Sequence, residues 1–333
     1  MLKEWLLKAL TAAPINQLMS SLLGQYVTIY MLHRPQPPSG AFEGTNPEQL
    51  EQAIIYAKAA GFHFASIDEL VFDALSGKKQ QQPTLCFTLD DGYQDQLDQL
   101  VPVLIKHGCK PTLFVIADMV NGDDWPWDAK LAHAIWNTTL STLPLHIEGA
   151  DQTFPLDSPE QRIATRRKLT GFAKRLSSEK LAEFLAMVFP VLGVNLSTPP
   201  PGYQPATWHS LRESEQKGLT IGSHGCSHRV FSSLNDAQIQ FELSKAKALL
   251  AQHLKSPSRV FCYPSGKAAD FFTTHSKLLS TQGYIGSLNS IAGNPSFNNI
   301  KAQPFSIHRH SFPNSLHTFI RYSSWLEHLR SKF

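Results

Sequence analysis

The chain has 333 residues, which is enough for one large domain or two smaller ones with a substantial core. Its hydrophobic content of 42% is ordinary for a globular protein and argues against a disordered chain. A formal net charge of +3, without a dense run of Lys or Arg, excludes a nucleic-acid-binding surface on grounds of charge. We therefore expect a folded protein whose partner is not a nucleic acid.

Residues 1–24 predict an amphipathic N-terminal helix, set apart from a main domain at 25–333. Apolar residues recur at helical spacing, beginning with Leu2, Leu6, Leu7 and Leu10. This stretch contains charges and is too short for a membrane span, and it lacks the features of a signal peptide. The helix either packs on the domain or lies on a membrane surface, and the sequence leaves both possibilities open.

Apolar runs rich in β-branched residues alternate with helix-like stretches along the main domain. Seven runs predict strands, at residues 25–32, 84–89, 112–117, 218–223, 259–264, 284–288 and 305–308. The intervening helices begin behind capping residues, as at Asn46 and Asn235. This alternation predicts a mostly parallel sheet that is covered by helices on both faces.

The segment at about 121–205 interrupts this alternation. It contains helix-like runs at 127–139, 158–176 and 178–192, and it ends in the proline-rich sequence STPPPG. We interpret it as a helical insertion in a barrel-like core, placed as a cap over one face.

The four cysteines are scattered and form no CxxC pair. Cys86 and Cys262 lie in apolar strand-like runs, where a free cysteine behaves as a small hydrophobic residue. This usage is typical of a reducing compartment and predicts a cytoplasmic protein, with peripheral membrane contact if the N-terminal helix lies on a bilayer.

Polar residues follow five of the predicted strands at their carboxyl ends. Two adjacent carboxylates, Asp90 and Asp91, end one strand, although burying them is costly without a cation or a functional need. The Asp-Gly pair alone would be typical of a turn. The other strand ends carry His33 and Arg34, residues 224–228, residues 264–266 and residues 308–310. Because barrel strands bring their carboxyl ends to one face, these groups together predict a functional site.

His224 and His228 are candidate metal ligands. Their i, i+4 spacing places both imidazoles on one face of a helical turn, although such a pair alone is more often solvent-exposed. With one aspartate from the strand end at 90–91 they form a set of three ligands with open positions, as in catalytic zinc sites. The neighbouring aspartate is then free to act on water as a general base.

Three segments resemble, in order and spacing, the signature motifs of polysaccharide deacetylases, the family with the NodB-homology domain (carbohydrate esterase family 4). They are TLDDGYQD (88–95), SHGCSH (223–228) and FCYPSG (261–266), supported by LHRP (32–35), CKPTLFVI (109–116) and HRHSF (308–312). The resemblance covers about residues 27–315. It implies a distorted (β/α) barrel with about seven parallel strands, a divalent metal that is usually zinc, and removal of acetyl groups from sugars.

Position by position, the resemblance implies that Asp90 is the base that deprotonates the attacking water. It assigns the metal to Asp91, His224 and His228. The turn after the third motif would line the substrate groove through Tyr263, Pro264 and Ser265, and the Ser265 N–H would help to hold the oxyanion.

The sequence departs from the family pattern at three positions. Cys262 replaces the arginine that often pairs with the base, as in the subgroup with a YP-x-G third motif, and Ser265 replaces an aromatic residue. Arg309 stands where the late general-acid histidine would lie, so either His308 or His310 would supply the proton, with His310 favoured. We predict that Arg309 pairs with Asp90 instead, because a guanidinium holds a carboxylate in a bidentate geometry.

The predicted function is that of a metal-dependent hydrolase of carbon–nitrogen bonds other than peptide bonds, which removes acetyl groups from an N-acetylated sugar or polysaccharide. An amide hydrolase of a small non-sugar substrate on the same barrel is one alternative. An inactive saccharide-binding relative is another, although the intact Asp-Asp-His-His set argues against it.

Overall fold

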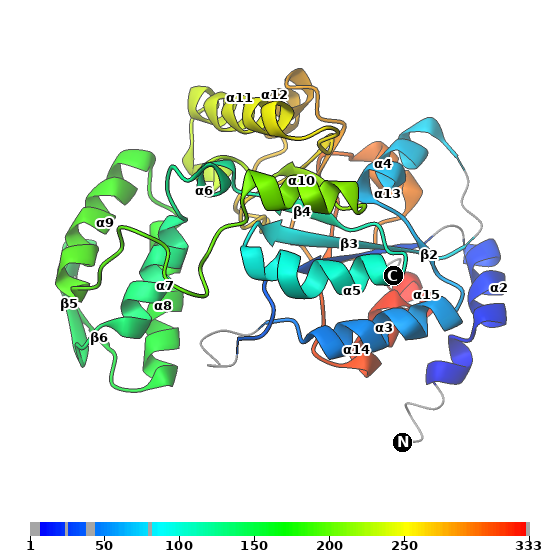
Figure 1. Ribbon diagram of the computed structural model, residues 1–333, viewed down its shortest axis with the longest axis horizontal. Coiled ribbons are helices and arrows are strands. Elements are labelled where there is room, and N and C mark those ends of the chain that lie inside the picture. Colours follow the sequence, from blue (N-terminus) through cyan, green and yellow to red (C-terminus); the bar gives the residue numbers. More distant parts are fainter. Residues whose placement is uncertain (1–6, 24–25, 38–43, 79–81, 331–333) are drawn as a thin grey trace.

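A curled sheet of eight parallel strands forms the centre of the molecule in the computed structural model, which describes residues 7–23, 26–37, 44–78 and 82–330 (Figure 1). Seven strands follow the order β10-β1-β3-β4-β7-β8-β9, and β2 pairs with β3. Their bounds are β1 (Val27–Leu32), β2 (His63–Phe64), β3 (Thr84–Asp91), β4 (Thr112–Val115), β7 (Thr220–Ser223), β8 (Val260–Cys262), β9 (Gly286–Leu288) and β10 (His310–Ser311). The predicted distorted barrel is thereby confirmed.

The barrel closes irregularly between β9 and β10. The strand predicted at 305–308 is reduced to a single bridge, in which Ile307 pairs with Leu288. Ile307 donates its N–H to the carbonyl of Ser287 and accepts from the N–H of Asn289. Residues 305–309 therefore cross the gap, and the strand proper begins at His310.

Helices cover the outer face of the sheet, and side chains on that face alternate with those of the inner face. The helices of the barrel are α3 (Pro47–Ala59), α4 (Ile67–Ser76), α5 (Val101–Lys106, behind the π-helical turn Gln96–Leu100), α6 (Ala117–Asn121), α10 (Trp208–Gln216), α11 (Asp236–His253, behind the 3₁₀ turn Phe231–Ser233), α12 (His275–Thr281), α13 (Phe297–Ala302), α14 (Leu316–Ser323) and α15 (Trp325–Arg330). On β3, Leu85 and Phe87 pack outward against this layer. Cys86 instead joins Ile29 and Val260 from other strands in the inner core. Thr88 and Asp90 continue the inward series, so the strand aims Asp90 at the barrel interior.

A separate lobe follows α6 and has a hydrophobic core of its own (Figure 1, left). It consists of α7 (Trp127–Asn137), the hairpin β5 (Thr142–Ile147) and β6 (Ala150–Pro155), α8 (Pro159–Ala173) and α9 (Ser178–Leu192). We refer to residues 127–192 as the insertion lobe. The sequence predicts its helices but not its hairpin, which forms where three buried residues, Leu143, Leu145 and Ile147, alternate with exposed ones.

The N-terminal helix α2 (Ala13–Leu23) packs near the amino-terminal ends of the strands, because its residue Asn16 hydrogen-bonds to Tyr26 and Ala60. The first part of the helix predicted at 1–24 lies outside the described residues, as does residue 24. No helix in the described part of the chain has both the length and the hydropathy needed to cross a membrane.

Candidate active site

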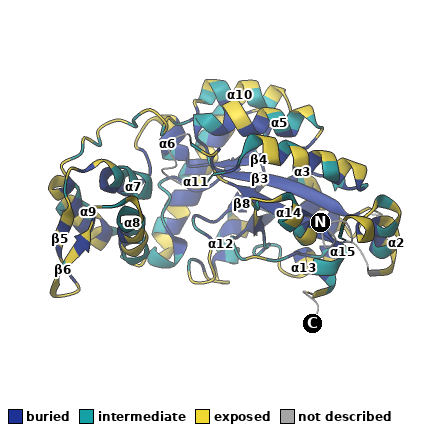
Figure 2. Cartoon of the chain, turned by 90° about the horizontal axis from the view of Figure 1, so that it is seen from below, coloured by how far each residue is buried: buried dark blue, intermediate teal, exposed yellow. Residues whose placement is uncertain are grey.

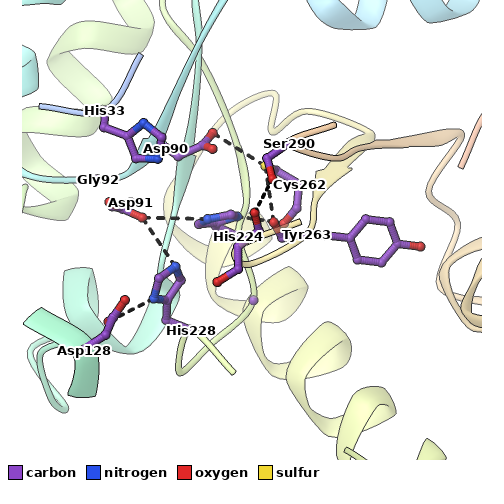
Figure 3. Close-up of polar contacts among 12 residues, drawn as sticks. His33, Asp90, Asp91, Gly92, Asp128, His224, His228, Cys262, Tyr263 and Ser290 are labelled. Carbon is purple, nitrogen blue, oxygen red and sulfur yellow. Dashed lines mark hydrogen bonds and ion pairs between the residues drawn. The ribbon is translucent and has the colours of Figure 1, made fainter. Parts of the chain in front are cut away.

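The end of β3 separates two consecutive carboxylates. Asp91 has a φ of 85° and Gly92 a φ of 94°, both in the left-handed region. Only glycine fits at position 92, since an added Cβ would lie 2.9 Å from the Val115 side chain. This turn leaves Asp90 pointing into the barrel, whereas Asp91 points toward the two motif histidines (Figure 3).

Asp90 forms a buried bidentate ion pair with Arg309. Both guanidinium nitrogens, Nη1 and Nη2, donate to the carboxylate at 2.8 Å, and Arg309 is 1% exposed. Arg309 is fixed by further bonds to the hydroxyl of Thr88 and the carbonyl of Asn289. Burial alone would raise the pKa of Asp90, but the charge of Arg309 and its hydrogen bonds outweigh burial and hold that pKa far below its usual range. Asp90 is therefore a carboxylate at every physiological pH.

Asp91, His224 and His228 converge on one point. The Oδ1 atom of Asp91 lies 3.7 Å from Nε2 of His224 and 3.6 Å from Nε2 of His228. In a tetrahedral zinc site each ligand atom lies roughly 2.0–2.2 Å from the ion, so two ligand atoms are about 3.3–3.6 Å apart. The three ligand atoms thus stand close to the spacing that a single divalent cation requires.

The second ring nitrogen of each histidine has an acceptor that fixes its tautomer. Nδ1 of His224 lies 2.8 Å from the carbonyl oxygen of Cys262, and Nδ1 of His228 lies 3.1 Å from Oδ1 of Asp128. Because both partners accept hydrogen bonds, Nδ1 of each ring carries a proton, and Nε2 of each ring faces Asp91. These residues therefore fit a divalent cation.

Burial lowers the pKa of His224, which favours the neutral ring that a metal ligand requires. Burial acts in the same direction on His228, but the carboxylate of Asp128 outweighs it and raises the pKa of His228 to about 9. The reciprocal effect lowers the pKa of Asp128 to about 2 against its own burial. A cation that binds to His228 must displace its second proton.

A second group of potential ligands, Asp90, His224 and Cys262, also lies close together. Its donor atoms are already in use, because Nη2 of Arg309 lies 3.1 Å from the Cys262 sulfur and the thiol lies 3.5 Å from Oδ1 of Asp90. Burial also raises the pKa of Cys262 well above its usual range, so it is a neutral thiol. This group is part of the base environment and does not form a second cation site.

The third motif forms a tight turn beside His224. Ser265 has a φ of 62°, and its N–H has no hydrogen-bond acceptor among the residues that the structure describes. An oriented, unpaired N–H of this kind suits a developing oxyanion. Tyr263 contributes only its backbone, since its ring points away from His224 and stacks on Phe271 at 4.4 Å (Figure 3). The predicted contribution of Tyr263 to the substrate groove therefore depends on its backbone. Pro264, the other predicted residue of the turn, is buried.

Neither late histidine contacts the cluster formed by Asp90, Asp91, His224 and His228. Alternation along the chain gives the inward position to Arg309, so the flanking histidines point elsewhere. His310 stacks on Tyr322 at 4.6 Å and hydrogen-bonds to Asn294, and burial lowers its pKa to about 4. His308 lies against Gly293. The expectation that one of them is the general acid therefore does not fit their positions.

His33 is the histidine that lies beside Asp90, at the end of β1 (Figure 3). Its side chain is exposed, and its charge helps to lower the pKa of Asp90. Gln96 is fully buried and fixes this corner, because its amide donates to the carbonyls of His33 and Asp90 and accepts from the N–H of Tyr93. The signal for His33 in the sequence is its position at a strand end, which it shares with the two aspartates.

Two further acidic residues support the histidine loop and carry no motif signal. Asp128, in α7, holds His228. Glu242, on the buried face of α11, accepts from the N–H groups of Cys226 and Ser227 and from the Ser227 hydroxyl. A carboxylate at a helix position that otherwise faces the core is the one clue to Glu242 in the sequence.

The family model for polysaccharide deacetylases matches residues 181–284, which include the second and third motifs. Over these residues the chain is similar to polysaccharide deacetylases. The resemblance of the second and third motifs is confirmed by this match, although no curated protein matches the chain.

Solved structures share the fold of this chain at low identity. The deacetylase PplD from Streptococcus pyogenes, in complex with acetate, is 16% identical, covers 90% of this chain and 98% of its own, and has a TM-score of 0.58. IcaB from Ammonifex degensii is 17% identical and has a TM-score of 0.57; the match covers 90% of this chain and 97% of the IcaB chain. The deacetylase domain of BpsB from Bordetella bronchiseptica is 14% identical and has a TM-score of 0.51; the match covers 86% of this chain and 97% of the BpsB chain. These likenesses extend over 86–90% of the chain.

Proposed function

We propose that this protein is a metal-dependent deacetylase that hydrolyses the acetyl amide of an N-acetylated saccharide. The observation that carries the proposal is the convergence of Asp91, His224 and His228 beside a separate, ionised carboxylate, Asp90. A structural cation site would need no neighbouring base. A hydrolytic site needs both.

Each side chain has a distinct task in this mechanism. A divalent cation, most simply zinc, supplies a Lewis acid when it is bound by Asp91, His224 and His228. Asp90, which Arg309 keeps ionised and fixed in place, accepts a proton from the attacking water. The N–H of Ser265 donates to the oxyanion of the tetrahedral intermediate. His33, exposed beside Asp90, gives a proton to the departing amine.

The surroundings of His33 favour a saccharide as the substrate. A cavity of about 540 Å³ opens beside it, between the ends of β1 and β10. Hydrogen-bonding side chains in its lining include Thr45, Ser311 and Asn314. Sugar hydroxyls require such donors and acceptors, whereas an apolar amide does not.

Acetate release from an acetylated chito-oligosaccharide tests the proposal, with protein that is chelated and then reloaded with zinc. We expect activity only in the zinc-loaded protein. His228→Ala should abolish both zinc retention and activity, because two of three ligands hold the ion far less tightly. His209→Ala, at an exposed position of α10, is the matched control and should retain both.

The alternatives give different results in the same experiment. An amide hydrolase of small molecules would bind zinc and cleave a simple acetamide but release no acetate from the glycan. An inactive relative would bind the saccharide without turnover. Full zinc occupancy in His228→Ala protein would overturn the assignment of the ligands.

A further inference from the structure

The insertion lobe contacts the histidine loop directly. The indole N–H of Trp127 donates to the carbonyl of His228 at 3.4 Å, and Oδ1 of Asp128 lies 3.1 Å from Nδ1 of the same residue. One residue further along, a guanidinium nitrogen of Arg229 donates to the carbonyl of Leu176 at 3.3 Å. The lobe is therefore in contact with a ligand of the candidate metal site.

We propose that Asp128 is a positioning residue of the metal centre, through which the insertion lobe sets the affinity of the site. This inference rests on the proposed function, since it assumes that His228 is a ligand. It adds a residue from a segment that lies 100 positions earlier in the chain and carries none of the three motifs.

His228 needs external support because its backbone is strained. Its φ of 57° is unusual for a residue with a Cβ, and such a backbone persists only where surrounding contacts hold it in place. The other motif histidine, His224, is held by the carbonyl of Cys262, which belongs to the barrel. The barrel thus orients one histidine and the lobe orients the other.

A carboxylate is chemically suited to this role. It accepts the Nδ1 proton, which turns the Nε2 lone pair toward Asp91, and it raises the basicity of the ring as a ligand. Asp128 lies in the first turn of α7, where the helix N-terminus stabilises its negative charge. A purely structural role for Asp128 would instead predict a loss of stability without an effect on the cation.

Zinc affinity measured by competition with a chromophoric chelator tests this proposal. Removal of such a supporting group usually weakens metal binding by about 10–100-fold, which is the change expected for Asp128→Ala. Asp128→Asn should lose less, because an amide oxygen still accepts the Nδ1 proton. Asp124→Ala is the control, since Asp124 lies at the same end of the lobe but pairs with Lys130.

The readout separates the possible outcomes. Wild-type protein that binds no zinc would refute the proposed function itself. Zinc affinity within about twofold of the wild type in both Asp128 variants would overturn the positioning role alone. If Asp128→Ala does not fold, Asp128→Asn decides, with unfolding of the metal-free protein as the check that its stability is intact.

A second, independent feature is the orientation of α2, which buries two of its polar side chains and leaves two of its leucines exposed. Asn16 and Ser20 are buried, and the Asn16 amide donates to the carbonyls of Thr11 and Ala60 at 2.7 Å and 3.2 Å. The hydroxyl of Tyr26 donates to the amide oxygen of Asn16. The hydrophobic effect would ordinarily bury the opposite face of such a helix.

An apolar stripe formed by Ile15, Leu18, Met19 and Leu22 at i, i+3, i+4 and i+7 runs along α2, beside the exposed polar residues Gln17 and Ser21. Leu18 is 58% and Leu22 is 69% exposed, and the other two are partly buried. Residues 9–33 contain no Asp, Glu, Lys or Arg, so no side-chain charge on α2 interrupts the stripe.

We infer that this stripe docks on the surface of a lipid bilayer. A helix of 11 residues is about 16 Å long, and its four side chains fall short of the roughly 600 Å² per partner that a stable dimer needs. A bilayer accepts a short apolar helix face without requiring a complementary protein surface. Since α2 lies where the strands begin, the docked protein would present the candidate active site, at the opposite strand ends, away from the lipid.

Co-sedimentation with vesicles of phosphatidylcholine and phosphatidylglycerol tests this inference. The double variant Leu18→Asp and Leu22→Asp should lower vesicle binding by at least about tenfold, since each leucine contributes on the order of 1.5–3 kcal/mol when buried. Phe72→Asp, at a 62% exposed position of α4, is the control. The inference is overturned if the double variant and the control bind vesicles equally, or if the wild type binds no vesicles. It is also overturned if the wild type is a dimer that the double variant dissociates.

Discussion

Asp90 and Asp91 are neighbours in the sequence but have different electrostatic surroundings. Asp90 is neutralised by a buried guanidinium, and Asp91 faces two imidazole nitrogens. The left-handed backbone at Asp91 produces this separation, because a regular strand would have sent Asp91 to the outer face. The strain at Asp91 is therefore part of how the site divides base and ligand roles between two identical side chains.

Asp90→Asn should retain zinc and lower turnover by about 10²–10⁴-fold, the usual contribution of a general base. The amide is nearly isosteric with the carboxylate but cannot accept the proton from water. Acetate release and zinc content, measured on the same preparation, check this. If Asp90→Asn loses the metal while Asp91→Asn keeps it, the two roles are reversed.

Arg309→Lys should lower turnover without changing zinc content. Lysine supplies one point charge in place of two parallel hydrogen bonds, so it opposes the effect of burial on Asp90 less well. The pKa of Asp90 is depressed in the folded protein, and it should rise in the variant. The acidic limb of the pH–rate profile then moves to higher pH.

Arg162→Lys provides the comparison for Arg309→Lys, since Arg162 caps carbonyls inside the insertion lobe and does not contact Asp90. It should leave the pH profile in place. A lower rate in Arg309→Lys with an unshifted acidic limb would mean that Arg309 supports the fold and does not orient the base.

At the scale of elements, strand alternation determines which polar residues enter the site. The inner face of β3 carries Cys86, Thr88 and Asp90 in turn, and Arg309, directly before β10, reaches Thr88 and Asp90 across the intervening strand β1. The same alternation sends His310 outward to Tyr322. Assigning both Arg309 and an adjacent histidine to the interior was therefore inconsistent with a regular strand.

Sequence patterns predicted the barrel and its strand-end motifs because these depend on local periodicity and on short, contiguous segments. The contacts of Asp128 and Glu242 depend on how the lobe and α11 pack against the histidine loop, and spacing along the chain does not encode that packing. The hairpin at β5 and β6 was missed because its apolar alternation is short and lies between strongly helical segments. Long-range docking, more than local propensity, limits what could be predicted.

Close packing between strands gives a prediction about β7. A Cβ added at Gly222 would lie 2.7 Å from the ring of Phe114, inside the barrel. Gly222→Ala should therefore destabilise the protein by about 1–3 kcal/mol through overpacking. Gly171→Ala, in α8 with no atom within 4 Å of the added Cβ, should be neutral or stabilising by up to about 1 kcal/mol. Urea denaturation measures both, and equal midpoints would contradict this account of the β4–β7 contact.

At the scale of the whole molecule, the candidate metal site lies where two hydrophobic cores meet. The barrel supplies Asp91 and both histidines, and the insertion lobe, with its own core, supplies Asp128. Figure 2 shows these two buried regions on either side of α6 and α11. A cation at this junction is linked to the folding of the barrel and to the docking of the lobe.

Zinc should therefore raise the thermal unfolding temperature of the wild-type protein. A ligand that binds only the folded state at about a hundred times its Kd stabilises that state by about 2.7 kcal/mol. Differential scanning calorimetry of chelated and zinc-loaded protein measures the shift, and the loaded protein should unfold in one transition because the ion ties both cores to the same loop. His228→Ala should show no zinc-dependent shift, while His209→Ala should behave like the wild type. An unfolding temperature that is the same with and without zinc in the wild type would show that the three ligands do not hold the ion in the folded protein.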